Sequence, residues 1–234
     1  MNRLKSGAAI VLTGVVAVLA GGGVHIASGA APAGSPLPKD VYADSRNRLP
    51  LPKREEMDDE GKAAFDELTR NSEWSTGSEP PSVRLYAPKV ARPLGAAHRY
   101  VTHSTVLPDH LVTIAVLVAA RERDSQYEWT LWETYGRDPK SPRHVEPAII
   151  DLLKYDKPAV GLGEKEAALI NFGRAMFREE KVPSATFAEA LRVFGRRGTV
   201  DLVELLTLSS SSAAELAAFD QQLPDGQKPL LPAR

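Results

Sequence analysis

Apolar residues after Met57 recur at intervals of three and four positions, which is the spacing of amphipathic helices. We therefore expect a series of helices, each with one face turned to a shared core. The pattern predicts helices over 58–71, 107–124, 125–136, 144–156, 163–181, 184–195 and 198–219. Between residues 79 and 103 it predicts two short helical pieces broken at Pro88, with Pro93 bending or restarting the second.

The segment 111–120 differs from the others because it is apolar on every side, with Thr113 as its one polar residue. A helix without a polar face is buried all round, so this segment is predicted to be the central core helix. Pro108 suits the first turn of this helix, and Asp109 suits its positive dipole end.

The helix expected over 125–136 begins with Ser125 followed three residues later by Glu128, the spacing of a capping box. In that arrangement the Ser125 hydroxyl accepts from the Glu128 backbone N–H, which contributes about 1 kcal/mol. Gly136 is predicted to end the helix as a C-cap. A capped helix with aromatic packing therefore explains this stretch without any function.

No alternating strand pattern appears, so the sequence predicts an all-α fold. The serines at 209–212 lie within helical pattern and are predicted to form a small-residue helix contact. We divide the chain into 1–30, a signal peptide; 31–53, a Pro-rich linker or extended arm; 54–220, the helical domain; and 221–234, a C-terminal tail.

The first 30 residues carry a short basic start, a long apolar stretch, and small residues at Ser28 and Ala30 that suit cleavage. The alternative is an uncleaved membrane anchor, because 7–26 is long enough to span a bilayer. The glycines and small residues at the end of the stretch favour cleavage. In both cases we expect the protein to act outside the cytoplasm, periplasmic or secreted.

Composition and net charge exclude several kinds of site and function. The chain has no cysteine, which excludes disulfides, thiolate nucleophiles and zinc held by cysteine. The formal net charge of −1 gives no basic footprint for nucleic acid. His98 and His103 are five residues apart, a poor spacing for a shared metal on one helix face, so we expect no metal site. His144 stands in a polar loop and carries little signal.

Residues 107–129, LPDHLVTIAVLVAARERDSQYEW, resemble the core of the carboxymuconolactone decarboxylase family, in the superfamily that includes the alkylhydroperoxidase D-type proteins. The flanking segments extend this resemblance over about 48–219. It implies an all-helical domain that assembles as a trimer or hexamer, with pockets between subunits. It further implies a small-molecule acid or lactone as substrate and no cofactor.

The peroxidase branch of that superfamily has a Cys-x-x-Cys pair, a relay histidine and a glutamate on the preceding helix. The resemblance places Ser125 and Glu128 at the two cysteine positions, Trp132 at the histidine and Thr113 at the glutamate. A serine hydroxyl does not cycle through a disulfide, so thiol peroxidase activity is excluded by that mechanism.

The decarboxylase branch normally lacks the cysteine pair, and Glu128 with Trp129 matches its usual motif. Removing CO2 from a carboxylated lactone needs an anion site and a proton donor. The candidate donors and catalytic groups are Glu128, Glu122, His98 and His103, and the candidate anion ligands are Arg121, Arg99 and Arg92. Tyr127, Trp132, Thr113, Ser125 and His103 are the candidate binding residues.

Each candidate also has an ordinary structural explanation. Glu128 suits a cap, Trp132 suits the core or a pocket wall, and Arg121 with Glu122 suits an oligomer interface. Two functions therefore remain open. The first is a lyase or proton-transfer enzyme for a small oxidised organic acid or lactone. The second is a non-catalytic member that binds a ligand or serves as a scaffold.

Overall fold

The computed structural model describes residues 36–70 and 80–234. The predicted signal peptide at 1–30 lies outside the described residues. Within them, no helix combines the length and the apolar character that crossing a bilayer requires.

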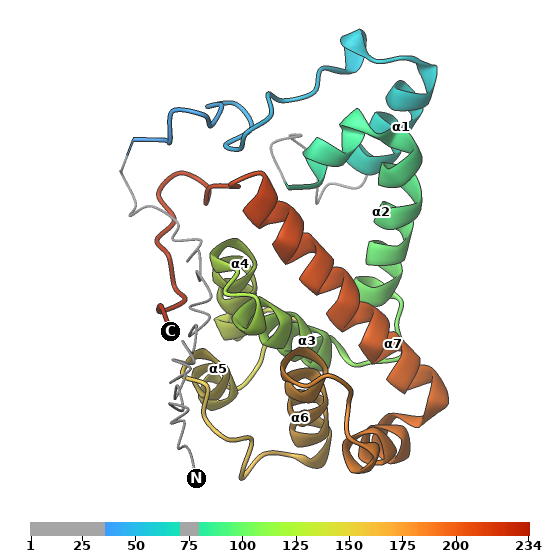
Figure 1. The fold of residues 1–234 in the computed structure, drawn as a ribbon, viewed down its shortest axis with the longest axis vertical. Helices are drawn as coiled ribbons and strands as arrows, with labels where there is room; N and C mark the ends of the chain where they lie inside the picture. Colours follow the sequence, from blue (N-terminus) through green and yellow to red (C-terminus); the bar gives the residue numbers. More distant parts are fainter. Residues whose placement is uncertain (1–35, 71–79) are drawn as a thin grey trace, which may run out of the picture.

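The described chain is helical throughout, and no strand occurs in 36–70 or 80–234, so the predicted all-α fold is confirmed. Figure 1 shows the elements in order. They are η1 (Arg54–Glu56), α1 (Asp59–Thr69), η3 (Pro80–Tyr86), α2 (Pro88–His103), α3 (Asp109–Glu122), α4 (Gln126–Arg137), α5 (Pro147–Lys154), α6 (Glu164–Arg178) and α7 (Ser184–Ala218).

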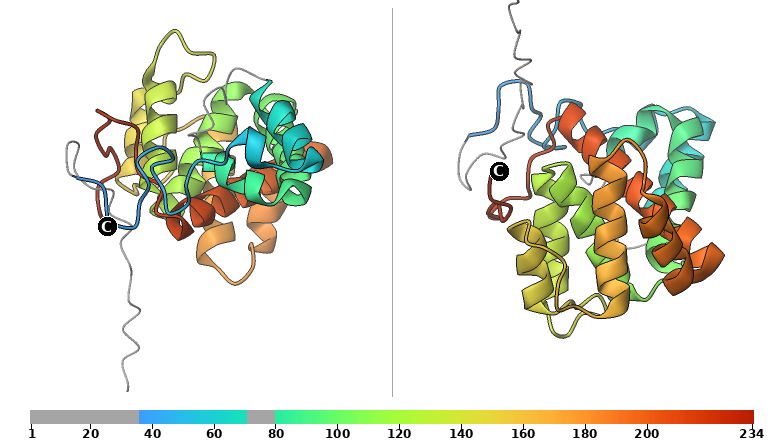
Figure 2. Two further views of the ribbon diagram at one scale, coloured as in Figure 1. Left: turned by 90° about the horizontal axis from the view of Figure 1, so that it is seen from above. Right: turned by 60° about the horizontal axis from the view of Figure 1, so that its bottom comes forward.

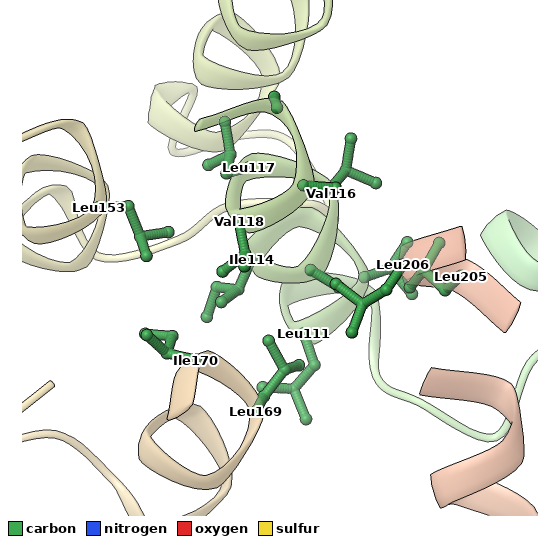
Figure 3. Packing of buried hydrophobic residues seen from close by; sticks show 14 of the residues in the cluster. Leu111, Ile114, Val116, Leu117, Val118, Leu153, Leu169, Ile170, Leu205 and Leu206 are labelled. Atoms are coloured by element: carbon green, nitrogen blue, oxygen red, sulfur yellow. The ribbon is translucent and has the colours of Figure 1, made fainter. Parts of the chain in front are cut away.

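Helix α3 is the centre of the fold, as its apolar sequence predicts. Every residue from 111 to 121 is buried, and α3 packs against α4, α5, α6 and α7. Figure 3 shows Leu111, Ile114 and Val118 among leucines and isoleucines of the surrounding helices. This burial on all sides provides most of the hydrophobic stabilisation of the domain.

Proline and glycine set several boundaries. Pro88 is the first residue of α2, where its missing N–H costs nothing, and Pro93 lies inside the helix without ending it. The two helices expected over 184–195 and 198–219 are present and meet at a kink at Gly195, and α7 denotes both together. Gly195 has φ 66° and ψ 179°, a conformation essentially restricted to glycine.

The predicted capping box of α4 is wrong. Ser125 is the N-cap residue, but its side chain makes no capping hydrogen bond. The Glu128 carboxylate accepts instead from the Trp132 side chain, one turn further along the helix, so it does not reach back to Ser125. Gly136 lies inside α4 rather than after it, where its lack of a side chain lets Thr113 and Ile150 pack closely.

The Pro-rich segment is an extended arm over residues 36–53, and it lies along the end of α7. The Arg48 N–H donates to the Phe219 carbonyl (2.9 Å), and the Gln222 N–H donates to the Arg46 carbonyl (2.8 Å). The 221–234 segment then returns past α4, as Figure 2 shows, and buries Leu223 and Leu231. The two ends of the described chain thereby cover one end of the helical core.

The serines at 209–212 lie on α7, as expected for a helix contact. Ser209 and Ser212 are buried, and the Ser210 hydroxyl accepts from Arg123 at 2.6 Å. The small residues let neighbouring elements approach α7 closely and supply acceptors for two arginines, one of which belongs to the site described below.

Candidate functional site

Glu128 and Trp132 lie one turn apart on α4 and interact directly. The indole N–H of Trp132, which only donates, forms a hydrogen bond to the Glu128 carboxylate. Trp132 is buried, and Glu128 is partly exposed. A residue four positions along a helix lies on the same face, so the helix geometry itself places these two groups together.

The Glu128 carboxyl has a pKa raised to about 7, because burial removes the water that stabilises its charged form. The Trp132 hydrogen bond and the positive charge of Arg84 act in the opposite direction and lower the pKa. The loss of water dominates. Glu128 therefore carries a proton for much of the time near pH 7, which gives it the acidity of a useful proton donor.

Arg84 reaches this site from η3 and is held by α7. Its Nε and Nη2 donate to the same Glu215 oxygen at 2.7 and 2.5 Å, and its Nη2 lies 3.5 Å from the Ser212 hydroxyl. Arg84 is buried, and it is close enough to influence the pKa of both Glu128 and His98. Arg84 is thus held in an ion pair with Glu215 while its positive charge still acts on Glu128 and His98.

Arg143 reaches the site from the loop between α4 and α5. The central carbon of its guanidinium lies 4.9 Å from the centroid of the Trp132 ring, within cation–π range. Its Nη2 donates to the Thr102 carbonyl (3.1 Å) and to Nδ1 of His103 (3.0 Å). Its Nη1 is buried and has no hydrogen-bond partner.

Thr113 fixes the loop that carries Arg143. Its buried hydroxyl lies 3.0 Å from the Arg143 carbonyl oxygen and 3.2 Å from that of Asp109. The resemblance places a glutamate of the proton relay at this position. In this chain the residue positions backbone and does not provide an acid.

His98 lies on α2 and has a pKa lowered to about 4. Burial is the main cause, and the positive charges of Arg84 and Arg143 add to it, with further contributions from His103 and Arg99. The imidazole is therefore neutral at pH 7. The structure thus brings His98 and His103 into the surroundings of Arg84 and Arg143, as part of the same group as Glu128 and Trp132.

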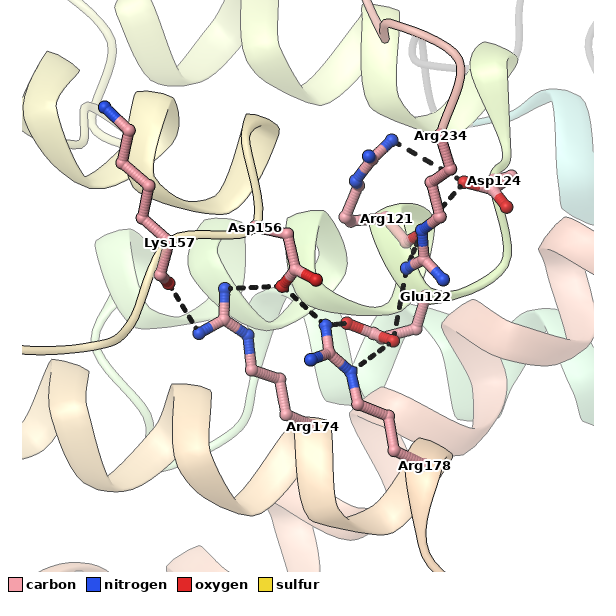
Figure 4. Close-up of polar contacts among 8 residues, drawn as sticks. All are labelled: Arg121, Glu122, Asp124, Asp156, Lys157, Arg174, Arg178 and Arg234. Atoms are coloured by element: carbon pink, nitrogen blue, oxygen red, sulfur yellow. Dashed lines mark hydrogen bonds and ion pairs between the residues drawn. The ribbon is translucent and has the colours of Figure 1, made fainter.

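Arg121 and Glu122 do not join this group. Figure 4 shows them in an ion-pair network with α6 and the C-terminal segment. The Glu122 side chain is 4% exposed and accepts from Arg178 and from Arg234, and Arg121 Nη1 donates to the Pro232 carbonyl at 2.9 Å. No hydrogen bond or ion pair within the described chain connects them to Glu128.

The remaining candidates lie elsewhere. Arg92 and Arg99 pair with Glu67 of α1 (2.8 and 3.4 Å) beside a surface hollow of about 550 Å³. Ser125 and Tyr127 line a narrow cleft of about 30 Å³ between the start of α4 and the end of α7. Tyr127 packs there against Leu216 and Leu223, so its environment is that of a core residue.

Sequence reasoning missed Arg84, Arg143 and Glu215. Arg84 offered a weak signal, because it stands between the buried apolar residues Val83 and Leu85. Arg143 stands in a polar loop among other charged residues, where nothing in the pattern distinguishes it. In the parts of the chain that the structure describes, no three His, Asp or Glu side chains are grouped as metal ligands.

Comparison with known proteins supports the fold. No family model and no curated protein matches the chain. A solved structure from Agrobacterium tumefaciens, a protein of unknown function suggested to be an antioxidant defence protein AhpD, is similar with a TM-score of 0.53. The fold is alkylhydroperoxidase D-like. The two proteins share 16% sequence identity over 61% of this chain and 95% of that chain, a level that establishes the alkylhydroperoxidase D-like fold and leaves activity open.

Proposed function

We propose that the protein is an enzyme that transfers a proton to a small organic acid or lactone, with Glu128 as the proton donor. The observation that supports this most strongly is the carboxyl of Glu128, which accepts a hydrogen bond from Trp132 and has a pKa of about 7 because burial removes water from it. A desolvated carboxylic acid close to the positive charge of Arg84 suits acid catalysis on an anionic substrate.

The reaction that fits the site is decarboxylation or isomerisation of an unsaturated carboxylated lactone. In a decarboxylation the bond between carbon and the departing carboxylate breaks, and its electron pair moves into the conjugated carbonyl system. Carbon dioxide leaves, and Glu128 gives its proton to the carbon that has gained the electron pair. Water then returns a proton to Glu128, so no electron acceptor is consumed.

His98 is the weaker candidate for the donor. Its pKa of about 4 leaves it neutral at pH 7, and a neutral imidazole is a much poorer acid than a carboxyl that titrates near 7. His98 is better suited to donate or accept a hydrogen bond to the substrate. Glu128 is therefore the residue on which the proposed chemistry depends.

A second candidate function is ligand binding without turnover, which was the alternative from sequence. The observation that favours it is Trp132, a side chain that does not titrate and is fixed by Glu128 and Arg143 at the position of the relay histidine. With one acid and no relay, the site would hold an organic acid without transforming it.

The experiment that separates the two functions follows lactone carboxylates in deuterated buffer by NMR. We expect the wild-type protein to release CO2 or to incorporate deuterium at carbon, and Glu128→Gln to be slower by about 100-fold or more. Glu146→Gln, which changes an exposed carboxylate, is the matched control and should keep full activity. Equal rates for Glu128→Gln and wild type would rule out Glu128 as donor, and binding without exchange would support the second function.

We also propose export and self-association. The sequence of residues 1–30 supports export, and fractionation of cells expressing the full chain tests it. The resemblance over about 48–219 supports a trimer or hexamer, which light scattering after size-exclusion chromatography measures directly.

A further inference from the structure

We propose that Arg143 binds the carboxylate of the substrate and that the site selects small monocarboxylates over dicarboxylates. This inference rests on the proposed function in its isomerisation form, in which the substrate keeps the carboxylate that Arg143 holds. It assigns to Arg143 the role that the sequence pattern gave to Arg121, Arg99 or Arg92.

Of the two terminal nitrogens of the Arg143 guanidinium, one forms hydrogen bonds and the other does not. Nη2 is occupied by the Thr102 carbonyl and by His103, whereas Nη1 is buried without a partner. A buried N–H that has lost water and gained no acceptor costs free energy. A carboxylate oxygen would satisfy this donor, and an arginine bound to a carboxylate forms the strong, directional bonds typical of such pairs.

The position of Arg143 is fixed before any ligand arrives. Its guanidinium is stacked on Trp132 at 4.9 Å, and its backbone carbonyl lies 3.0 Å from the Thr113 hydroxyl on the central helix. Little side-chain entropy then remains to be lost on binding, which favours affinity for a small ligand. The tryptophan thus serves as a platform for the cation.

The balance of charge at the site favours one negative group. Arg84 forms an ion pair with Glu215, whereas in the described segments Arg143 has no Asp or Glu as an ion-pair partner. Guanidinium nitrogens only donate, so Nδ1 of His103 is the acceptor in its hydrogen bond with Arg143. Within the described segments, Arg143 is therefore the arginine of this site that a carboxylate can still pair with, and a second carboxylate would meet the negative charges of Glu128 or Glu215.

Trp132 also limits the size of the ligand. Glu128 and Arg143 both contact its side chain, Glu128 through the indole N–H and Arg143 through the ring face. A small molecule held by Arg143 therefore lies beside the same indole that faces Glu128. This arrangement favours a small ligand, such as a five-membered lactone that carries one carboxylate.

Isothermal titration calorimetry at pH 7 tests the proposal with the monocarboxylate of γ-butyrolactone, its methyl ester, and the dicarboxylate isocitric lactone. We expect the full-length wild-type protein to bind the monocarboxylate at least about tenfold more tightly than the other two. Arg143→Gln should lose about tenfold or more in affinity for the monocarboxylate. Arg92→Gln, the matched control on the outer side of α2, should bind as wild type.

Two further variants keep the result interpretable. Arg143→Lys retains the charge but loses the planar fork, so we expect intermediate affinity, and thermal unfolding verifies that both Arg143 variants fold. Glu128→Gln should still bind the monocarboxylate, so a failure of the proposed catalysis is seen as binding without turnover. Unchanged affinity in Arg143→Gln, equal affinity for the dicarboxylate, or no binding of the monocarboxylate by wild type would each overturn the assignment of Arg143.

Discussion

The guanidinium of Arg143 lies 4.9 Å from the ring centroid of Trp132, which joins the loop after α4 to the face of α4 that carries Glu128. From the sequence, the resemblance places Trp132 where a relay histidine is expected. The contact gives this tryptophan a role of its own. It positions a cation with its ring and stabilises the charged form of Glu128 with its N–H.

Replacing Trp132 separates these two roles. Trp132→Phe keeps an aromatic face for Arg143 but removes the N–H, so the pKa of Glu128 should rise further, because the Trp132 hydrogen bond lowers it. Trp132→Leu removes both interactions and should also weaken monocarboxylate binding. Carboxyl-carbon NMR and calorimetry measure the two effects. A Phe variant with a lowered Glu128 pKa would contradict this division of roles.

Glu128 should make the protein less stable as the pH rises. Its pKa is about 7 in the folded chain and about 4.3 when unfolded, so between these values the folded state holds the extra proton. Stability therefore falls as the pH rises through this range, by about 3 to 4 kcal/mol. Glu128→Gln cannot titrate and so does not lose this stability. In urea unfolding, the free energy of unfolding of the variant should therefore rise relative to that of wild type between pH 4 and pH 8. A constant difference between the two proteins would show that Glu128 titrates normally.

His98 should act in the opposite direction. Its pKa is about 4 when folded and about 6.5 when unfolded, so the unfolded state holds the extra proton between these values. Stability is then lost as the pH falls from 6.5 to 4, again by about 3 to 4 kcal/mol. His98→Asn should therefore resist acid better than wild type. In wild type the effects of Glu128 and His98 on stability partly cancel between pH 4.5 and 6.5. A variant that lacks one of the two residues should show the pH dependence of stability that the other residue causes.

Gly195 should resist substitution because of its backbone. At φ 66° and ψ 179° a side chain is strained, although nothing lies within 4 Å of the position that its Cβ would take. Gly195→Ala should lower the free energy of unfolding by about 1 to 3 kcal/mol. Arg196→Ala, the neighbouring exposed control, should change it by less than about 0.5 kcal/mol. Chemical denaturation measures both, and equal effects would show that the interruption in α7 is not a backbone constraint.

The fold was largely predictable from local pattern. The segment 111–120 has no polar face, so burial on all sides followed from composition alone, and the prolines at 88 and 108 marked helix starts by their missing N–H. The capping box failed for a local reason. Two donors lie within a helical turn of the Glu128 carboxylate, the backbone N–H of Ser125 and the indole N–H of Trp132. The carboxylate accepts from the buried Trp132 and not from Ser125.

The sequence predicted the part of the site in which the residues belong to a single helix. Glu128 and Trp132 share a face of α4, which spacing alone shows. Arg84 and Arg143 reach them through the packing of η3 against α7 and of a loop against Thr113, contacts between residues far apart in sequence. The sequence also suggested Arg121 and Glu122 as site residues, because they stand at a helix end. In the structure Glu122 forms ion pairs with arginines of α6 and of the C-terminal segment, contacts that local sequence does not reveal.

The most direct test of the central claim is the titration of Glu128 itself, followed by NMR of carboxyl carbons in protein labelled at glutamate, with Glu128→Gln to assign the signal. We predict a midpoint near pH 7, where the acid retains its proton beside Trp132 and within reach of Arg84. A midpoint near 4.3, the value of an exposed glutamate, would leave the site without a proton donor at neutral pH and would contradict the account.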